Sequence, residues 1–174
     1  MQRNMFRFQS AIDHYELMDN RQSPIGNRKS SILAERVTHS PEETVRFGRE
    51  IAAHLQAPFL VLLQGELGAG KTTLVKGIVA GLGAASEDEV TSPSFTLVHE
   101  YGSAGQVFHA DLYRIEGARD LATLGLEDLS NPTATVLVEW GEKLGDNAPI
   151  PCVKIRMEHQ GSDNRRILIE RVEA

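Results

Sequence analysis

Gly65-Glu-Leu-Gly-Ala-Gly-Lys71-Thr72 is the stretch of this sequence that decides its fold. It matches the phosphate-binding P-loop pattern G-x-x-x-x-G-K-[ST] at every fixed position. In this pattern backbone N–H groups converge on phosphate oxygens, and glycines recur because a Cβ at several positions would block the approach. Lys71 would place its charge on the β- and γ-phosphates, and the Thr72 hydroxyl would ligate Mg²⁺.

The residues on either side supply the strand and the helix that a P-loop needs. Residues 59–63, Phe-Leu-Val-Leu-Leu, form an apolar run of the kind that a buried parallel strand shows. Residues 73–82 carry apolar side chains at helical spacing, and Gly83 is a suitable helix stop. The alternative, a glycine-rich turn with an incidental lysine, would not need this context. The sequence therefore predicts binding of a nucleoside triphosphate at the start of a helix, whose dipole adds to the attraction.

The composition is that of one globular domain, and it excludes several classes of protein. At 174 residues, with 41% hydrophobic and 24% charged residues, the chain is long enough to bury a core. The net charge of −6 argues against a dedicated nucleic-acid binder and leaves room for a basic protein partner. The single cysteine, Cys152, rules out an internal disulfide and a cysteine zinc site, which fits a reducing cytoplasm. No apolar run approaches the roughly 18 residues of a membrane-spanning helix, so we expect a cytoplasmic protein without a membrane partner.

We expect the chain to divide into a short extension and one domain. Residues 1–30 mix Arg, Asn, Gln and Ser with isolated aromatics, and residues 22–30 have the composition of a flexible linker. They lack the apolar segment of a secretory signal, and Asp13, Glu16 and Asp19 interrupt the basic character of a mitochondrial transit peptide. We interpret residues 1–30 as a flexible N-terminal extension, with a partner-binding arm as the alternative, and residues 31–174 as the P-loop domain.

Further strands and helices are expected on both sides of the P-loop. Ser40, Pro41 and Glu43 mark a helix start, and Ala57-Pro58 would end that helix. The fold class is therefore α/β, a P-loop NTPase-like three-layer fold with a mixed parallel and antiparallel sheet. The other expected elements are strands at residues 31–37 and 135–139, a hairpin of residues 95–101 and 106–111, a helix at residues 118–129, and a hairpin of residues 152–157 and 166–170.

Two acidic residues at strand ends are candidates to complete a hydrolytic site. Glu139 follows the apolar run of residues 136–138, and Asp111 follows the apolar pair of residues 107–108 on another strand. P-loop proteins take such a carboxylate from a neighbouring strand to hold the metal ion. Because residues 136–138 have the character of the more central strand, we expect Glu139 to bind Mg²⁺, directly or through water. Asp111 would then orient the attacking water or couple the nucleotide state to a mobile loop. Exposed strand-end caps are the alternative for both.

Two features near these carboxylates have alternative interpretations. Trp140, the only tryptophan, directly follows Glu139 and is expected either in the core or beside the site, where it could form a docking surface. Residues 91–95, Thr-Ser-Pro-Ser-Phe, follow the P-loop helix and could sense the γ-phosphate as switch loops do. The alternative for residues 91–95 is a plain connecting turn.

Four motifs occur together in one order and spacing. They are Gly-Glu-Leu-Gly-Ala-Gly-Lys-Thr-Thr at residues 65–73, Thr-Ser-Pro-Ser-Phe-Thr-Leu-Val at residues 91–98, His-Ala-Asp-Leu-Tyr-Arg at residues 109–114 and Leu-Val-Glu-Trp at residues 137–140. Together they resemble the TsaE family, bacterial ATPases needed for the threonylcarbamoyladenosine (t6A) modification of tRNA. The resemblance covers about residues 32–172 and says nothing of residues 1–30.

The resemblance implies a small ATPase that uses ATP and Mg²⁺ and does not itself transfer the threonylcarbamoyl group. It would associate with the TsaB–TsaD heterodimer, meet tRNA only indirectly through that complex, and allow the transferase to turn over repeatedly. The resemblance also implies that residues 67–72 cradle the phosphates, that Thr72 and Glu139 hold Mg²⁺ and that Asp111 is needed for hydrolysis. Nucleotide contacts at Ser40, Pro41 and Gly161 are implied by the resemblance alone.

Together these residues form one candidate site for a nucleotide and a metal ion. The candidate catalytic residues are Lys71, Asp111 and Glu139, and the candidate metal ligands are Thr72 and Glu139. The candidate nucleotide-binding residues are Ser40, Pro41, Gly65, Leu67, Gly68, Ala69, Gly70, Lys71, Thr72, Thr73 and Gly161.

A P-loop small-molecule kinase is the main alternative function. Such kinases need an acceptor site and usually an arginine-bearing lid. Arg114 and Arg119 could serve in a lid, but residues 111–130 are too few to hold a lid and an acceptor pocket as well. A GTPase is disfavoured because no Asn-Lys-x-Asp tetrapeptide is present to read guanine. A nucleotide-dependent binding module with negligible turnover is the third possibility. No arginine finger is evident in the sequence, so we expect slow hydrolysis without partners.

Overall fold

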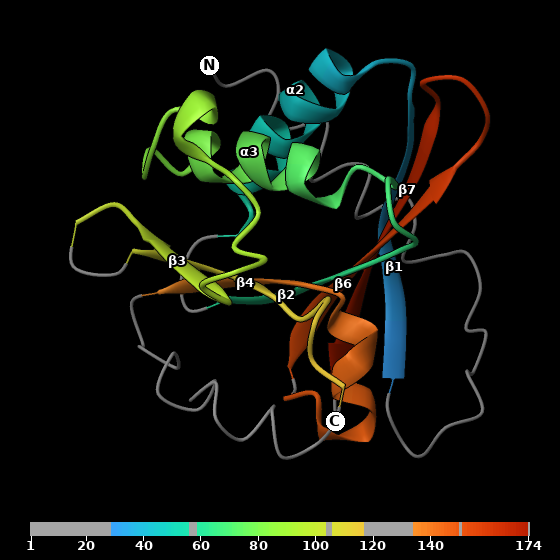
Figure 1. Cartoon of the computed structure of the whole chain (residues 1–174). Coiled ribbons are helices and arrows are strands. Elements are labelled where there is room, and N and C mark those ends of the chain that lie inside the picture. The colour runs from blue at the N-terminus through green and yellow to red at the C-terminus, as the bar shows by residue number, and fades with distance from the viewer. Residues whose placement is uncertain (1–28, 56–58, 104–105, 117–133, 150, 174) are drawn as a thin grey trace.

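The computed structural model describes residues 29–55, 59–103, 106–116, 134–149 and 151–173 (Figure 1). Most of the expected extension and the helix expected at residues 118–129 lie outside the described residues. The helix that was expected to run to Ala57-Pro58 ends earlier, at Ala52. Within the described part of the chain, no helix is long and apolar enough to cross a bilayer. In chain order the elements are β1 (Lys29–Thr38), α2 (Pro41–Ala52), β2 (Phe59–Gln64), α3 (Lys71–Gly81), η1 (Glu87–Glu89), β3 (Val98–Tyr101), β4 (Val107–Asp111), β5 (Thr135–Glu139), η2 (Gly141–Asn147), β6 (Cys152–His159) and β7 (Arg165–Glu173).

The strands form a single mixed sheet, in the order β1-β7-β6-β2-β5-β4-β3. The inner strands β6, β2, β5 and β4 pair in parallel. The outer strands β3, β7 and β1 pair antiparallel with their neighbours. The mixed sheet and both expected hairpins, β3–β4 and β6–β7, are therefore confirmed.

The central strands β2 and β5 are buried on both faces, as their continuous apolar runs predict. Successive side chains of a strand point to opposite faces of a sheet. Accordingly Val61 and Leu137 join the core under α2 and α3, whereas Leu62 and Val138 join a second core on the other face. The P-loop strand is thus fixed from both sides.

α2 and α3 cover one face of the sheet, at the top of Figure 1. Ser40 caps α2 as predicted, because its hydroxyl oxygen accepts a hydrogen bond from the Glu43 backbone N–H at 3.2 Å. The two helices pack closely through facing glycines. A Cβ on Gly48 would lie 2.9 Å from the Cα of Gly77, and a Cβ on Gly77 would overlap the carbonyl oxygen of Val45. This close contact fixes the P-loop helix against its neighbour.

The opposite face of the sheet carries η2, drawn in orange at the bottom of Figure 1. η2 begins directly against the P-loop strand, since a Cβ on Gly141 would lie 2.7 Å from the Cβ of Leu62. The sequence did not predict this short helix. With α2 and α3 on one face and η2 on the other, the expected three-layer α/β fold is confirmed.

The expected strand at residues 95–101 is wrong in its first half. β3 begins at Val98, and residues 94–96 form a turn. Leu97 has a φ of +66°, its N–H donates to the carbonyl of Pro93 at 2.7 Å, and its own carbonyl accepts from the N–H of Asp111 at 3.1 Å. This tight turn outweighs the strand propensity of Phe95 and its neighbours. It also ties the segment to the end of β4.

Candidate functional site

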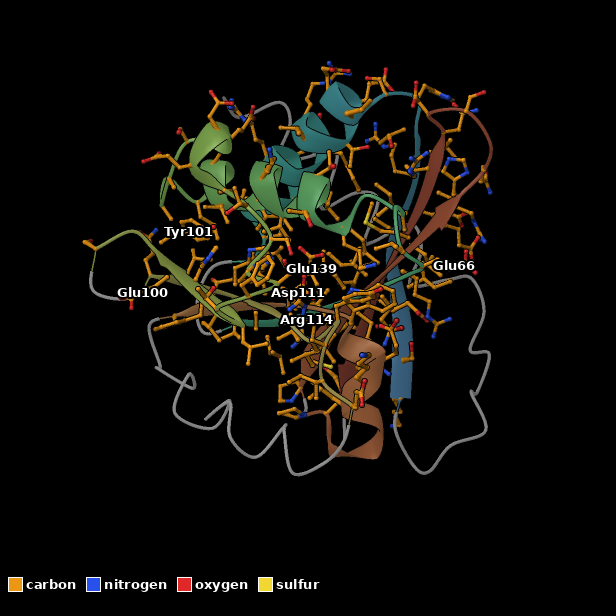
Figure 2. The ribbon with its side chains drawn as sticks, in the orientation of Figure 1. Glu66, Glu100, Tyr101, Asp111, Arg114 and Glu139 are labelled. Atoms are coloured by element: carbon orange, nitrogen blue, oxygen red, sulfur yellow. The ribbon has the colours of Figure 1, made fainter. Side chains whose placement is uncertain are left out.

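The P-loop lies at the carboxyl edge of the parallel strands, between β2 and α3. The strand register brings both candidate carboxylates to the same edge. Glu139 of β5 pairs with Leu63 of β2, and Asp111 of β4 pairs with Glu139. Figure 2 shows the two carboxylates between the sheet and α3. Their placement beside the P-loop strand is the one expected from the sequence.

The P-loop backbone takes conformations that glycine adopts readily and other residues do not. Gly65, Gly68 and Gly70 have φ values of +143°, +79° and +97°. A Cβ on Gly65 would overlap the carbonyl oxygen of Met157 in β6, whereas a Cβ on Gly68 would meet no atom within 4 Å. Gly70 is the N-cap of α3 and brings no side chain to the first N–H groups of the helix, which remain for an anion. The loop is therefore shaped as a phosphate cradle.

Lys71 is buried within the loop. Its ammonium donates to the carbonyl oxygens of Gly65 at 2.6 Å and Glu66 at 2.9 Å, and it lies 3.9 Å from the ring centre of Trp140. Burial lowers the pKa of Lys71, and nearby carboxylates, first among them Glu139, oppose that shift. Carbonyl oxygens are weaker partners for an ammonium than phosphate oxygens are. A phosphate at this loop could therefore replace these carbonyl contacts of Lys71.

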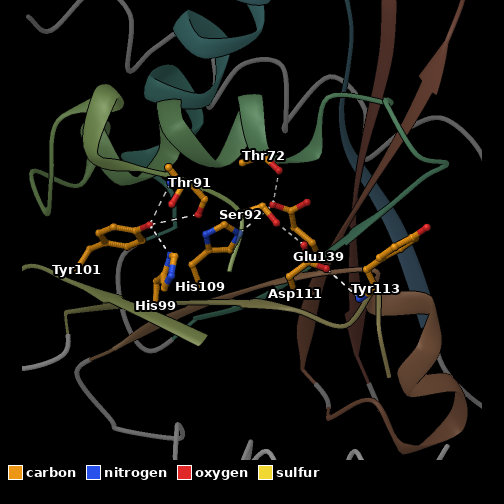
Figure 3. A network of polar contacts seen from close by, with 9 residues as sticks. All are labelled: Thr72, Thr91, Ser92, His99, Tyr101, His109, Asp111, Tyr113 and Glu139. Carbon is orange, nitrogen blue, oxygen red and sulfur yellow. Dashed lines mark hydrogen bonds and ion pairs between the residues drawn. The ribbon is translucent and has the colours of Figure 1, made fainter. Parts of the chain in front are cut away.

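Glu139 is the centre of a buried polar network (Figure 3). The Thr72 hydroxyl donates to Glu139 Oε1 at 2.8 Å, and His109 Nε2 lies 2.9 Å from the same oxygen. His109 is fully buried, and its Nδ1 has no hydrogen-bond partner among the described residues. The tautomer with the proton on Nε2 therefore satisfies the contact, with the ring donating to the carboxylate. His109 holds Glu139 facing Thr72.

Asp111 forms a separate set of contacts in the same network (Figure 3). Its Oδ1 accepts from the backbone N–H of Tyr113 at 2.9 Å, and its Oδ2 accepts from the hydroxyl of Ser92. Ser92 belongs to the segment at residues 91–95 that was expected either to sense the γ-phosphate or to be a plain turn. The structure joins this segment to Asp111 through Ser92. A movement of the segment would therefore shift the Asp111 carboxylate, and a movement of the carboxylate would shift the segment.

Trp140 packs beside the site. Its backbone is left-handed, with a φ of +59°, and its ring lies 5.2 Å from the ring of Tyr113 and under the Lys71 ammonium. The same ring packs on the second core. Trp140 is therefore both a core residue and a wall of the site, which combines two of the expected alternatives.

Two peripheral candidates, Ser40 and Gly161, lie on segments that contact each other. His39, next to Ser40, places Nδ1 2.9 Å from the side-chain oxygen of Asn164 in the β6–β7 turn. Gly161 is in the same turn, with a φ of +84°. The Ser40 hydroxyl oxygen is occupied by the α2 cap. The structure brings these segments together, while their contact with a nucleotide stays a prediction.

The other candidates surround the loop at different depths. Ala69 is buried, and Leu67 is 76% exposed on the outside of the loop. Pro41 and Thr73 line one surface groove of about 580 Å³ on α2 and α3. Glu139 and Asp111 do not line this groove, so the candidate chemistry lies at these two carboxylates rather than in the groove.

The residues present fit a magnesium nucleotide. Mg²⁺ is usually held by one or two carboxylates together with substrate phosphates and water. Thr72 and Glu139 supply a hydroxyl and a carboxylate at 2.8 Å from each other, beside a glycine cradle whose N–H groups suit phosphate. The described residues contain no group of three or more His, Cys, Asp or Glu side chains that would hold a metal alone. A metal ion held by Thr72 and Glu139 would therefore need further ligands, which nucleotide phosphates and water could supply.

Sequence reasoning missed His109 and did not single out Ser92 as a partner of Asp111. A signal for His109 was present, because it precedes Asp111 by two residues on one strand and therefore shares its face. No local signal indicates the contact of Ser92, which depends on the turn that precedes β3.

A mixed α/β sheet with parallel inner strands, and with this loop at the end of the central strand β2, is the architecture of the P-loop class of proteins. The chain belongs to the TsaE family, because the sequence model described as "Threonylcarbamoyl adenosine biosynthesis protein TsaE" matches residues 38–167. It is similar to the tRNA threonylcarbamoyladenosine biosynthesis protein TsaE of Treponema pallidum, at 35% identity over 76% of this chain and 97% of that protein. It is also similar to the protein of that name from Bacillus subtilis, at 35% identity over 75% of this chain and 80% of that protein. The crystal structure of Bacillus subtilis YdiB superposes with a TM-score of 0.63 at 29% identity, over 84% of this chain and 88% of YdiB.

Proposed function

We propose that this chain is a Mg²⁺-dependent ATPase that serves formation of t6A at A37 of tRNA. It acts in the cytoplasm with the TsaB–TsaD heterodimer and meets tRNA only through that complex. Membership of the TsaE family supports the pathway. The observation that carries the ATPase assignment is the 2.8 Å contact between the Thr72 hydroxyl and the Glu139 carboxylate, at the end of a P-loop whose lysine is already in place.

The P-loop residues have distinct tasks in this proposal. Lys71 exchanges its carbonyl partners for the β- and γ-phosphates, and the N–H groups that follow Gly70 bind phosphate oxygens. Thr72 and Glu139 hold Mg²⁺, which when bound neutralises the charge that develops on the phosphates. His109 keeps the Glu139 carboxylate in position for that task.

In this proposal Asp111 orients the attacking water. Ser92, which is hydrogen-bonded to Asp111, lets the segment at residues 91–95 respond to the presence of the γ-phosphate. Asp111 is buried and already accepts two hydrogen bonds, so its carboxylate is held in one orientation. Loss of the γ-phosphate would change what the segment at residues 91–95 contacts, and the surface it presents to a partner would change as well. ATP binding and hydrolysis would then drive association with the transferase and release from it.

The test is an ATPase assay with the purified chain alone and with added TsaB–TsaD. We expect slow turnover alone, faster turnover with the heterodimer and none for Lys71→Ala. A pull-down of TsaB–TsaD with and without ATP should show nucleotide-dependent association. Fast turnover that is indifferent to the heterodimer, or no association in either nucleotide state, would contradict the partner cycle. Transfer of phosphate to a metabolite would instead establish a kinase.

A further inference from the structure

Arg165, the first residue of β7, extends toward the P-loop. Its side chain shares a face with Ile167 and Ile169, because alternate residues of a strand point the same way. Those two isoleucines belong to the core beneath α2 and α3. Arg165 continues the same face beyond that core, where the sheet ends and the P-loop begins. β7 thus places the Arg165 guanidinium next to the P-loop.

The contacts of Arg165 place its guanidinium against the middle of the P-loop. Nη2 donates to the carbonyl oxygen of Gly68 over a long 3.4 Å, and Nη1 donates to the carbonyls of Ser162 at 3.3 Å and Asn164 at 3.0 Å. A Cβ on Gly70, the N-cap of α3, would lie 3.8 Å from its Nε. The hairpin carbonyls fix one side of the guanidinium, and the side toward the loop makes only the long contact.

The charge of Arg165 is not neutralised within the described residues. All its hydrogen-bond acceptors are backbone carbonyls, and no described carboxylate lies within ion-pair distance. By contrast, the other described arginines, apart from Arg114, form ion pairs with glutamates. These paired residues are Arg36, Arg46, Arg49, Arg156, Arg166 and Arg171. An unpaired arginine beside a loop built for an anion calls for an anionic partner.

We propose that Arg165 binds a phosphate group of the nucleotide, as a second cation beside Lys71. The proposal rests on the proposed function, because it assumes that the P-loop binds a nucleoside triphosphate. A planar guanidinium forms two parallel hydrogen bonds with phosphate oxygens, which are stronger than one long bond to a neutral carbonyl. No local motif in the sequence indicates an arginine at the phosphates. The β6–β7 hairpin supplies one from this chain and connects the hairpin to nucleotide binding.

The variant Arg165→Ala tests this inference against a matched control, Arg166→Ala. Arg166 has the same charge and follows Arg165 directly, but it pairs with Glu35 and Glu158 away from the loop. The affinities for Mg·ATP and Mg·ADP are measured by calorimetry. We expect Arg165→Ala to weaken both by about tenfold or more, the effect of losing a hydrogen bond to a charged group. Arg166→Ala should leave both within about twofold of wild type.

Two further variants separate phosphate binding from mere bracing of the loop. Arg165→Lys keeps the charge and should recover part of the lost affinity, whereas Arg165→Gln keeps a donor for the Gly68 carbonyl and should not. Melting without nucleotide checks that each variant folds. The inference is overturned if Arg165→Ala binds like Arg166→Ala, or if Gln recovers the affinity and Lys does not. If the wild type and Lys71→Ala both fail to bind nucleotide, the proposed function fails and the inference fails with it.

Discussion

Substitution of Gly65 by alanine should strongly destabilise the fold, even without nucleotide. A Cβ at this position would lie 3.2 Å from the Cβ of Ala69 and 3.3 Å from the carbonyl carbon of Met157, and closer still to the carbonyl oxygen of Met157. Those last two atoms belong to the backbone of β6, which is paired with β2 and cannot give way cheaply. The close approach of β6 therefore leaves no room for a side chain at residue 65.

The size of the effect follows from two costs. Forcing a side chain into the packed contact costs about 2 kcal/mol, and holding alanine at a φ of +143° costs about 2 kcal/mol more. For a chain of this size, 1 kcal/mol shifts the melting temperature by about 2–4 °C. Gly65→Ala should therefore melt about 8–16 °C below the wild type.

Gly68→Ala is the matched control. Gly68 also has a positive φ, +79°, but a Cβ there would meet nothing within 4 Å. Only the backbone strain remains, about 1–2 kcal/mol, so its melting temperature should fall by about 2–8 °C. Both variants are compared by circular dichroism without nucleotide. The reasoning is refuted if Gly65→Ala melts no lower than Gly68→Ala.

Three further substitutions probe the polar groups of the site. His109→Leu should weaken the apparent Mg²⁺ affinity in ATP hydrolysis by about 10- to 100-fold, because His109 contacts Glu139, the proposed metal ligand, and loss of a residue that positions a ligand usually costs that much. His99→Leu, a histidine of the same hairpin, should not. Asp111→Asn should lower kcat about 100-fold and leave the Kd of ATP little changed, and a parallel rise in Kd would contradict a role in positioning water. Burial lowers the pKa of Lys71 in the folded chain. At a pH between the folded and the unfolded pKa, Lys71 is therefore protonated in more of the unfolded chains than of the folded ones. Because the unfolded chain binds more protons there, the stability of the fold rises with pH in that range. As the pH rises toward the ordinary pKa of a lysine, the melting temperature of the nucleotide-free wild type should therefore gain on that of Lys71→Met, and a constant difference would count against the shift.

The sequence predicted those parts of the fold that depend on local pattern. The apolar runs at residues 59–63 and 135–139 predicted the central strands nearly to the residue, and Ser40 with Pro41 predicted the start of α2. Each depends on neighbours along the chain, through burial period or through a cap. The turn at Leu97 was not predicted, because one of its two hydrogen bonds comes from Asp111 at the end of β4, which is distant in the sequence.

The candidate site was predicted as a set of strand ends, without its internal contacts. Glu139 and Asp111 could be placed at one edge because parallel strands end together. The position of β6 beside β2 sets both the contact at Gly65 and the aim of Arg165, and it follows from strand order rather than from any local motif. Strand order depends on contacts between distant segments, which one sequence does not display.

The most direct test of the ATPase assignment is a Mg²⁺ titration of ATP binding and hydrolysis, with wild type and Glu139→Gln side by side. Gln has nearly the shape of Glu and keeps an oxygen for Thr72 and His109, but it lacks the negative charge that attracts Mg²⁺ to this site in the proposal. We predict that Mg²⁺ tightens ATP binding and starts hydrolysis in the wild type, while Glu139→Gln still binds ATP without responding to Mg²⁺. An equal Mg²⁺ response in both proteins, or no hydrolysis by the wild type even with TsaB–TsaD present, would contradict the account.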